Sequence, residues 1–528
     1  MKPLIFFLYL LIGVFIISMS GCYRTYEAVK LNIDTLPSSQ TFTDQFKVYL
    51  KNDNILIYKN GFTRNDNALI GYYEAYNYDG TILKVDSIIS LDSISAITQY
   101  VETTSGGMYF ASAMNLFFGV PLTFMAVYCL ACPKCCFGSC PTIYVPSDNE
   151  CILEAELFSK CISRQLEDND LDMIKYDIPS DGIIKLKITN EALETHYINK
   201  FNLIAVTHPS DSKVLQTNDD RITVIKELIP ANDATSSSGK NIAELLKSDD
   251  EIYFRSEEGK ILELRDKPVK DFIEITSDVK PPKDKVKMLI KYRNTLLTTT
   301  LLYDVVIGSQ GINALDWTKK MNNDYTYAMQ FKAVYNLFSG ISIQCYENNH
   351  WIETGKFQDA GPINWKYSVT EIPVSDDGKI QVRLNFVPDN FMIDYIAFDT
   401  TESENNFSIE KLNPFLITDY NKQIRNEISD FISSDDNHYL ITNPGYSYLL
   451  TYKIQKPSKE KVSLFIESKG YYNEWIRGNW INNQNVNYTF NLFDIQGTLN
   501  QLVTSWIDNK DLLEEEFFNA KIPLKEAK

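Results

Sequence analysis

The chain of 528 residues is poor in histidine and in positive charge. It has four histidines, and no two of them stand at the spacing typical of metal ligands. Lysine and arginine number 51 against 69 aspartate and glutamate residues, which gives a formal net charge of -18. Nucleic acids are bound through basic patches, so this deficit argues against a nucleic-acid partner.

Local catalytic motifs are also missing from the sequence. It contains no nucleophile elbow, phosphate-binding glycine loop, zinc-protease helix or dinucleotide fingerprint. The paired carboxylates of a glycoside hydrolase come from separate strands, so an enzyme of that class would leave no such motif. We therefore assign no catalytic residue, expect no cofactor, and favour binding or scaffolding over catalysis.

Residues 1–22 have the pattern of a bacterial lipoprotein signal peptide. Lys2 precedes an apolar run that is too short to span a bilayer, and small residues lead to Cys22, whose thiol can be acylated. After cleavage, two or three acyl chains such as palmitate would hold Cys22 in a membrane, because one chain gives only marginal binding. Tyr23, rather than aspartate, follows Cys22, so we expect the outer membrane of the cell envelope.

Residues 106–141 combine a second apolar segment with a cysteine cluster. Residues 108–131 carry no charge and are long enough to span a membrane, yet Gly119 and Pro121 favour a hairpin that enters one leaflet. We expect this segment to be membrane-associated.

Five of the nine cysteines lie within residues 129–140. Their spacing departs from that of iron–sulfur ligand runs, so we expect no metal there. A disulfide between Cys136 and Cys140 is our preferred interpretation of the cluster, and free buried thiols are the second interpretation. A redox or metal site built from the cluster remains the second alternative function.

Short stretches of alternating apolar and polar residues predict a mainly β protein with minor helix. The chain is too long for one core. We expect a small antiparallel β module at residues 23–105, an immunoglobulin-like β-sandwich at 142–230 and a larger, jelly-roll-like sandwich at 241–490. The polar segment 232–240 is predicted to be a linker. In residues 380–386 every second side chain is apolar, which predicts one buried face.

Two helices are predicted among the strands. The first is inserted in the larger sandwich at residues 294–309, with Asn294 as N-cap. The second belongs to the C-terminal region 491–528, where Leu502, Trp506 and Leu513 follow helical spacing.

Two further patterns have competing interpretations. Asp168, Asp170 and Asp172 alternate as calcium ligands could, but the glycine and glutamate of an EF-hand loop are absent, so we predict a solvated turn. Trp475 and Trp480 could stack on sugar rings if they are exposed, although such aromatic clusters are more often core.

Three segments resemble a bacterial envelope lipoprotein family of uncharacterised function. They are CFGSCPTIYV with ILEAELFSKCISRQLE (136–167), KLKITNEALETHYINKFNLIAVTHP (185–209) and VKMLIKYRNTLLTTTLLYDVV (286–306). The resemblance implies a small N-terminal β module, an apolar stretch, a Cys-Pro motif and β-sandwich domains, and it supplies no catalytic residues.

The leading hypothesis is therefore a membrane-anchored envelope lipoprotein. It would bind or scaffold an envelope protein or a glycan. A carbohydrate-binding or carbohydrate-processing protein is the alternative function.

Overall fold

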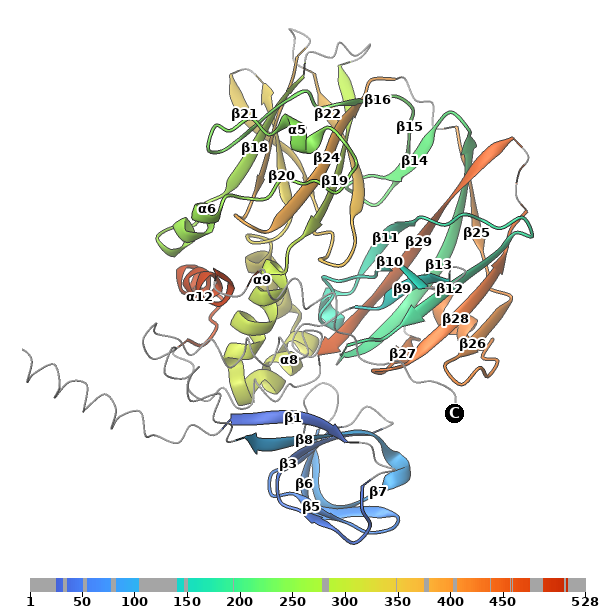
Figure 1. The fold of residues 1–528 in the computed structure, drawn as a ribbon, viewed down its shortest axis with the longest axis vertical. Coiled ribbons are helices and arrows are strands. Elements are labelled where there is room, and N and C mark those ends of the chain that lie inside the picture. Colours follow the sequence, from blue (N-terminus) through green and yellow to red (C-terminus); the bar gives the residue numbers. More distant parts are fainter. Residues whose placement is uncertain are drawn as a thin grey trace, which may run out of the picture. The chain divides into compact units, whose positions relative to one another are not determined.

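The computed structural model confirms a mainly β protein with several antiparallel sheets and few helices (Figure 1). It describes residues 25–31, 36–50, 55–76, 82–103, 140–146, 151–192, 194–277, 284–347, 349–374, 379–401, 406–436, 438–455, 457, 459–474, 488–507 and 510. The chain divides into two compact units, residues 1–128 and 129–528. Within the described ranges, no helix has the length and apolarity needed to cross a membrane.

Unit 1 is an eight-stranded antiparallel sheet with the strand order β1-β8-β3-β4-β6-β5-β2, and β7 pairs with β6. Its strands are β1 (Thr25–Leu31), β2 (Thr41–Phe42), β3 (Gln45–Leu50), β4 (Ile55–Tyr58), β5 (Phe62–Arg64), β6 (Ala68–Tyr76), β7 (Ile82–Ser90) and β8 (Ile94–Thr103). Its core combines aliphatic side chains with a group of aromatic rings, in which the Phe46 and Phe62 ring centroids lie 4.5 Å apart.

Unit 2 contains a first sandwich, which we call the split sandwich because its strands come from both ends of the unit. One sheet has the order β10 (Cys151–Glu156), β9 (Thr142–Pro146), β12 (Ile183–Thr189), β28 (Ser447–Lys453) and β26 (Leu416–Asp419). The other has the order β11 (Asp168–Ile174), β29 (Glu460–Glu474), β13 (Glu194–Pro209) and β25 (Ser408–Leu412), with β27 (Leu440–Thr442) beside β13.

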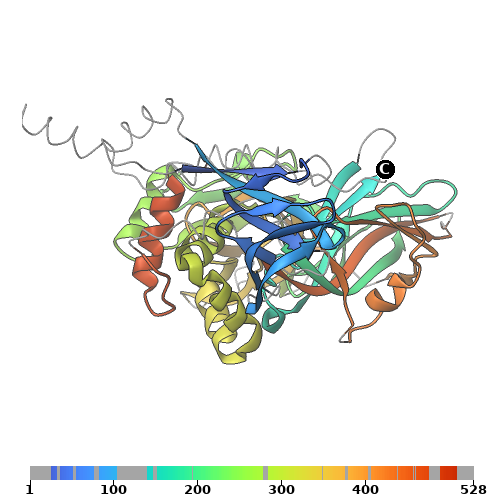
Figure 2. The same cartoon turned by 90° about the horizontal axis from the view of Figure 1, so that it is seen from below.

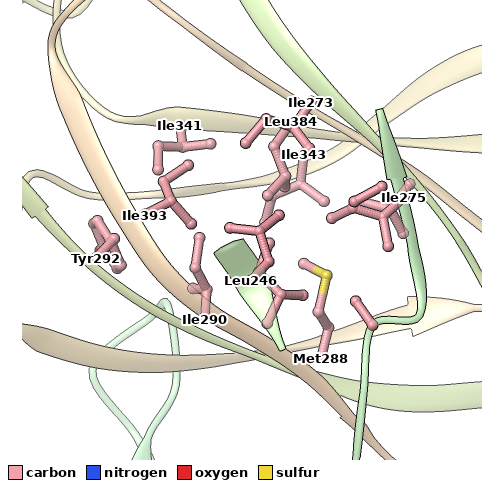
Figure 3. Packing of buried hydrophobic residues seen from close by; sticks show 14 of the residues in the cluster. Leu246, Ile273, Ile275, Met288, Ile290, Tyr292, Ile341, Ile343, Leu384 and Ile393 are labelled. Atoms are coloured by element: carbon pink, nitrogen blue, oxygen red, sulfur yellow. The ribbon is translucent and has the colours of Figure 1, made fainter. Parts of the chain in front are cut away.

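The second sandwich of unit 2, which we call the inserted sandwich, is continuous in sequence. One of its sheets has the order β16 (Leu228–Pro230), β24 (Phe391–Asp399), β19 (Lys285–Asn294) and β22 (Lys366–Pro373). The other has the order β17 (Asp233–Ser236), β18 (Asp271–Ser277), β23 (Ile380–Phe386), β20 (Ile341–Glu347) and β21 (His350–Phe357). Figure 3 shows Ile273, Ile343 and Leu384 of one sheet directed toward Met288 and Ile290 of the other. The predicted alternation in residues 380–386 is confirmed, because every second residue of β23 is buried.

The predicted division into a sandwich at 142–230 and another at 241–490 is wrong in its boundaries. β28 and β29 complete the first sandwich by pairing with β12 and β13. The inserted sandwich lies in the connection between β13 and β25, which are antiparallel neighbours with Thr207 opposite Ser408. Local alternation predicts that a strand has a buried face, but it carries no information on which distant strand will pair with it.

The predicted linker at 232–240 is also wrong, because it contains β17. This strand pairs with β18, and its Ala234 side chain is buried in the core of the inserted sandwich. The segment is polar because its remaining side chains form an edge strand and a turn.

A hairpin of β14 (Lys213–Gln216) and β15 (Ile222–Ile225) joins the two sandwiches. Successive strand residues point to opposite faces, so the hairpin has two apolar surfaces. Val214 and Val224 pack against apolar side chains of the split sandwich. Leu215 and Ile225 pack against Leu289 and Val369 of the inserted sandwich.

The predicted helical insertion is present between β19 and β20, although it is longer and less regular than expected. It consists of α7 (Leu297–Thr300), the π-helical η5 (Leu301–Ile307), the 3-10 segment η6 (Gly308–Asn313), α8 (Ala314–Asn323) and α9 (Tyr325–Tyr335). Asn294 is not its N-cap but the last residue of β19, and the Thr295 hydroxyl accepts a hydrogen bond from Leu297 N–H instead.

The predicted C-terminal helix is α12 (Ile495–Ile507), and both cartoons show it beside α8 and α9 (Figures 1 and 2). It contacts α7 and η5, and its Trp506 side chain is fully buried. Shorter helical segments are η2 (Leu91–Ser93), η3 (Arg164–Leu166), α5 (Ala243–Leu246), α6 (Glu258–Leu262), η4 (Glu263–Arg265) and α10 (Ile428–Ile432).

Candidate ligand-binding cleft

Most of the residues predicted from sequence to form sites lie outside the described residues. This holds for Cys22, Cys136, Trp475, Trp480 and the apolar segment 108–131. The lipid anchor and the sugar-stacking tryptophans therefore stay predictions. Cys140 is described and is a free thiol, which does not support the predicted disulfide with Cys136.

Three of the described cysteines are buried. Cys140, Cys161 and Cys345 are free thiols, and burial raises the pKa of Cys161 to about 12. A thiol reacts as its thiolate, so Cys161 is poorly suited to nucleophilic chemistry at neutral pH. No group of three or more metal-binding side chains occurs within the described ranges.

The aspartate run at 168–172 is not the solvated turn predicted from sequence; it is part of strand β11. Side chains two residues apart share one face of a strand, so the backbone directs Asp170 and Asp172 to the same side. Lys366 of β22 lies between them, with its Nζ 3.4 Å from Asp170 Oδ1 and 3.3 Å from Asp172 Oδ1. All three side chains are largely buried.

This triad is electrostatically asymmetric. Burial and the neighbouring Asp170 raise the pKa of Asp172 to about 7. Burial acts in the same direction on Asp170, but Lys366 and Lys160 outweigh it and hold its pKa below the usual value. One ammonium can stabilise only one nearby carboxylate fully, so the second carboxyl group titrates near neutrality.

The triad lies beside a polar cleft in which three parts of unit 2 meet. The split sandwich contributes Lys160 and Asp170, the hairpin contributes Gln216 and its turn, and the inserted sandwich contributes Lys366. The space between the lining residues is about 390 Å³ when the open solvent at its mouth is included. Its enclosed part is only about 20 Å³, which is room for about one water molecule.

The turn of the hairpin is fixed against the inserted sandwich. Thr217 N–H donates to Arg221 O at 2.7 Å, and Asp220 adopts the left-handed conformation (φ 57°) that closes such a turn. Asn218 N–H donates to Val369 O at 2.9 Å, which attaches the turn to edge strand β22. The preceding residue, Gln216, is thereby held in the wall of the cleft.

Gln216 is the unusual member of this wall. Its side chain is only 2% exposed, yet its Nε2 has no hydrogen-bond partner among the described residues. Buried polar groups in folded proteins are nearly always paired, so an orphaned amide in a residue that lines a cleft indicates a place for a water or a small ligand atom.

A second polar cluster lies where β13, β29 and the helical insertion meet. Glu194 and Glu474 are directly opposite on neighbouring strands, and the Tyr303 hydroxyl donates to Glu474 and lies 3.5 Å from Glu194 Oε1. His196 Nε2 is 3.1 Å from Glu194 Oε2, and burial lowers the pKa of His196 to about 3. These side chains are buried and tie the strand ends to the helices, so we assign the cluster a structural role.

The sequence contained one signal for the cleft, the alternating aspartates at 168–172, and its interpretation as a turn was wrong. Aspartates at every second position mark one face of a strand as readily as they mark a calcium loop. Lys366 and Gln216 had no local signal, because Lys366 is 196 residues from Asp170 along the chain.

Comparisons with known proteins do not place the chain in a family. It matches no family model, and no curated protein matches it. Among solved structures, one similarity is to a glycoside hydrolase family 31 α-xylosidase from Xanthomonas citri, with 5% identity over 84% of this chain and a TM-score of 0.14. The match spans 36% of the α-xylosidase chain. At that TM-score the likeness carries no argument about fold or function.

Proposed function

We propose that the protein is a lipid-anchored binding protein of the bacterial cell envelope, whose unit 2 binds a small polar ligand in the cleft. The observation that carries the binding role is the buried Gln216 amide, which has no partner in the part of the chain that the structure describes. A buried donor that is left unpaired costs about 1–3 kcal/mol, and a ligand acceptor would remove that cost.

Catalysis of glycoside hydrolysis is the competing function, since Asp170 and Asp172 have pKa values shifted in opposite directions. The geometry disfavours it. A glycosidase places its two carboxyl groups on opposite sides of the bond that is cleaved. Asp170 and Asp172 lie on one face of one strand and share Lys366, so they would meet a ligand from the same side.

The membrane-anchored part of the proposal rests on residues 1–22. Metabolic labelling with a palmitate analogue tests it: the wild-type chain should be labelled and sediment with outer membranes, and Cys22→Ser should lose the label. A Cys22→Ser chain that is still acylated at the wild-type level would contradict the anchor. Membrane retention without acylation would instead assign the attachment to residues 108–131.

The binding role can be tested on the full chain in detergent by saturation-transfer difference NMR. Three classes of probe are offered: neutral sugars (glucose, galactose and N-acetylglucosamine), the amine spermidine, and the carboxylate citrate. We expect at least one class to give a signal that Gln216→Leu abolishes. If no class does so while the protein remains folded, the cleft is not a binding site.

A further inference from the structure

We infer that the contact between the two sandwiches of unit 2 is a pH-sensitive joint, which is tighter at pH 5 than at pH 7. The group that changes its charge is Asp172, which is largely buried at this contact. The inference goes beyond the proposed binding function and does not depend on it, because it concerns only the charges of the protein itself.

A buried charge cluster lies across the boundary between the sandwiches. Lys366 belongs to β22 of the inserted sandwich, and its partners Asp170 and Asp172 belong to β11 of the split sandwich. Met173, the next residue of β11, packs against the apolar cluster of the hairpin and the inserted sandwich. A change of charge at Asp172 therefore acts directly on the attachment of one sandwich to the other.

The two aspartates are unequally supplied with hydrogen bonds. Asp170 accepts from Phe158 N–H at 2.8 Å, from Leu171 N–H at 3.0 Å and from Lys366. Asp172 Oδ1 accepts from Lys366 at 3.3 Å, but its Oδ2 is buried with no hydrogen-bond partner among the described residues. Burial without a donor penalises a charged oxygen far more than a neutral one. The geometry thus favours the neutral form of Asp172 at the closed contact.

The charged groups around Asp172 act mainly in the same direction. Burial, Asp170 on the same strand and Asp220 of the hairpin turn raise the pKa of Asp172, and Lys366 opposes them only in part. The neighbouring strand β29 places the apolar Ile466 opposite Asp172, so it supplies no compensating charge there. The triad also interacts with Lys160 and Tyr292.

The raised pKa of Asp172 fixes the sign of the pH dependence. Its value of about 7 lies above the ordinary value of about 4, so between these values the closed contact binds more protons than an open contact in which Asp172 meets water. The stabilising contribution is therefore complete below the ordinary pKa and is lost as the pH rises to about 7. Asp170 has a lowered pKa and stays ionised from pH 5 upward, so it adds no dependence in this range.

Hydrogen–deuterium exchange of the full chain in detergent, measured by mass spectrometry from pH 5 to pH 9 and corrected for intrinsic exchange, tests the joint. The segment 216–221 is the readout, because Asn218 N–H donates across the contact to Val369 O at 2.9 Å. Asp172→Asn keeps the size of the side chain and cannot ionise. The protection of this variant relative to the wild type should rise by up to tenfold per pH unit between pH 5 and 7, and level off above about 8.

Two further variants complete the test. Asp211→Asn is the matched control, since the Asp211 side chain is 70% exposed, and its protection relative to the wild type should not vary with pH. Asp170→Asn leaves Lys366 to Asp172 alone. This lowers the pKa of Asp172, so the protection of the variant should depend less on pH than that of the wild type.

A relative protection of Asp172→Asn that rises over this pH range, with a constant value for Asp211→Asn, supports the joint. A constant value for Asp172→Asn, or an equal rise for Asp211→Asn, overturns it. If Asp172→Asn does not fold, Asp170→Asn decides: the same pH dependence in this variant as in the wild type overturns the joint, and a weaker one supports it.

Discussion

The two sandwiches of unit 2 both bury charged groups, such as Lys291 and Asp394 in the inserted sandwich, but they differ in how their central strands are filled. The inserted sandwich has one continuous apolar cluster to which both sheets and α5 contribute. The long central strands β13 and β29 of the split sandwich instead bury many polar and charged side chains: Glu194, Thr195, His196, Asn199, Asn202, His208, Ser468, Asn473 and Glu474.

This difference shows two ways to stabilise similar architectures. Apolar burial is non-directional, so the inserted sandwich depends on shape and volume. A buried polar group must find a partner of the right geometry, so the split sandwich depends on specific pairs. The first kind of interior should respond to loss of volume, and the second to pH.

The largest effect is expected where α12 packs against the helical insertion. Trp506 is fully buried, and its indole N–H donates to Asp389 Oδ2 at 2.7 Å. Trp506→Ala should lower the free energy of unfolding by about 3–5 kcal/mol, measured by chemical denaturation. Phe493→Ala, at a side chain that is 85% exposed, is the control and should change little. Equal effects of the two substitutions would contradict a structural role for α12.

A substitution in the apolar cluster tests the volume dependence of the inserted sandwich. Leu384→Ala removes a side chain with no exposure from the centre of β23, and should cost about 2–5 kcal/mol. The cost should be the same at acidic and neutral pH, because the cluster has no titratable group that changes charge in that range. Gln381→Ala, on the opposite face of the same strand, should have a much smaller effect. A strong pH dependence of the Leu384→Ala cost would erase the contrast between the sandwiches.

The pH dependence of the split sandwich should be visible at His196. Its folded pKa of about 3 lies below the ordinary value, so the native state binds fewer protons than the unfolded state between those values. The contribution to stability is therefore present above the unfolded pKa and is lost as the pH falls toward 3. Between neutral pH and about pH 5 the loss should be about 2 kcal/mol.

His196→Gln should remove this acid sensitivity, measured as the difference in unfolding free energy between wild type and variant at each pH. The comparison with a variant is needed because Asp172 acts in the opposite direction: its pKa of about 7 is raised, so its contribution is lost as the pH rises. His438→Gln is the control, since the His438 side chain is exposed. If the difference in unfolding free energy between wild type and His196→Gln does not vary with pH, His196 is not buried in its neutral form.

The smallest predicted effect concerns aromatic pairs. Tyr197 and Tyr471 of the split sandwich are stacked, with ring centroids 4.6 Å apart and planes at 7°. A double-mutant cycle with leucine should give a coupling energy of about 0.5–1.5 kcal/mol. The pair Phe386 and Phe391 of the inserted sandwich, at 6.1 Å and 75°, provides the comparison. A coupling energy near zero for both pairs would mean that ring geometry adds nothing to burial.

Much of the local structure was predictable because it depends on short-range periodicity. Alternation identified β23 and its buried face, and helical spacing identified the region of α12. The domain boundaries were not predictable, because β28 and β29 pair with strands more than 200 residues earlier, as Lys453 opposite Ile183 shows. Nothing in a strand's own residues specifies such a partner.

The cleft illustrates the same limit. The alternating aspartates of β11 were visible in the sequence, but their interpretation as a turn was wrong, because a solvated run of charge and a buried one have the same spacing. What distinguishes them is Lys366, which β22 brings from a distant part of the chain.

The sequence by itself determined the fold class, the faces of strands such as β23 and the presence of a helical insertion, since each depends on neighbours within a few residues. Only the tertiary structure decided that one sandwich is inserted into the other, that Asp170 and Asp172 share one lysine, and that the Gln216 amide is buried with no partner among the residues described. The physical reason is that burial and charge pairing are properties of contacts between distant segments, which arise only when the chain has folded.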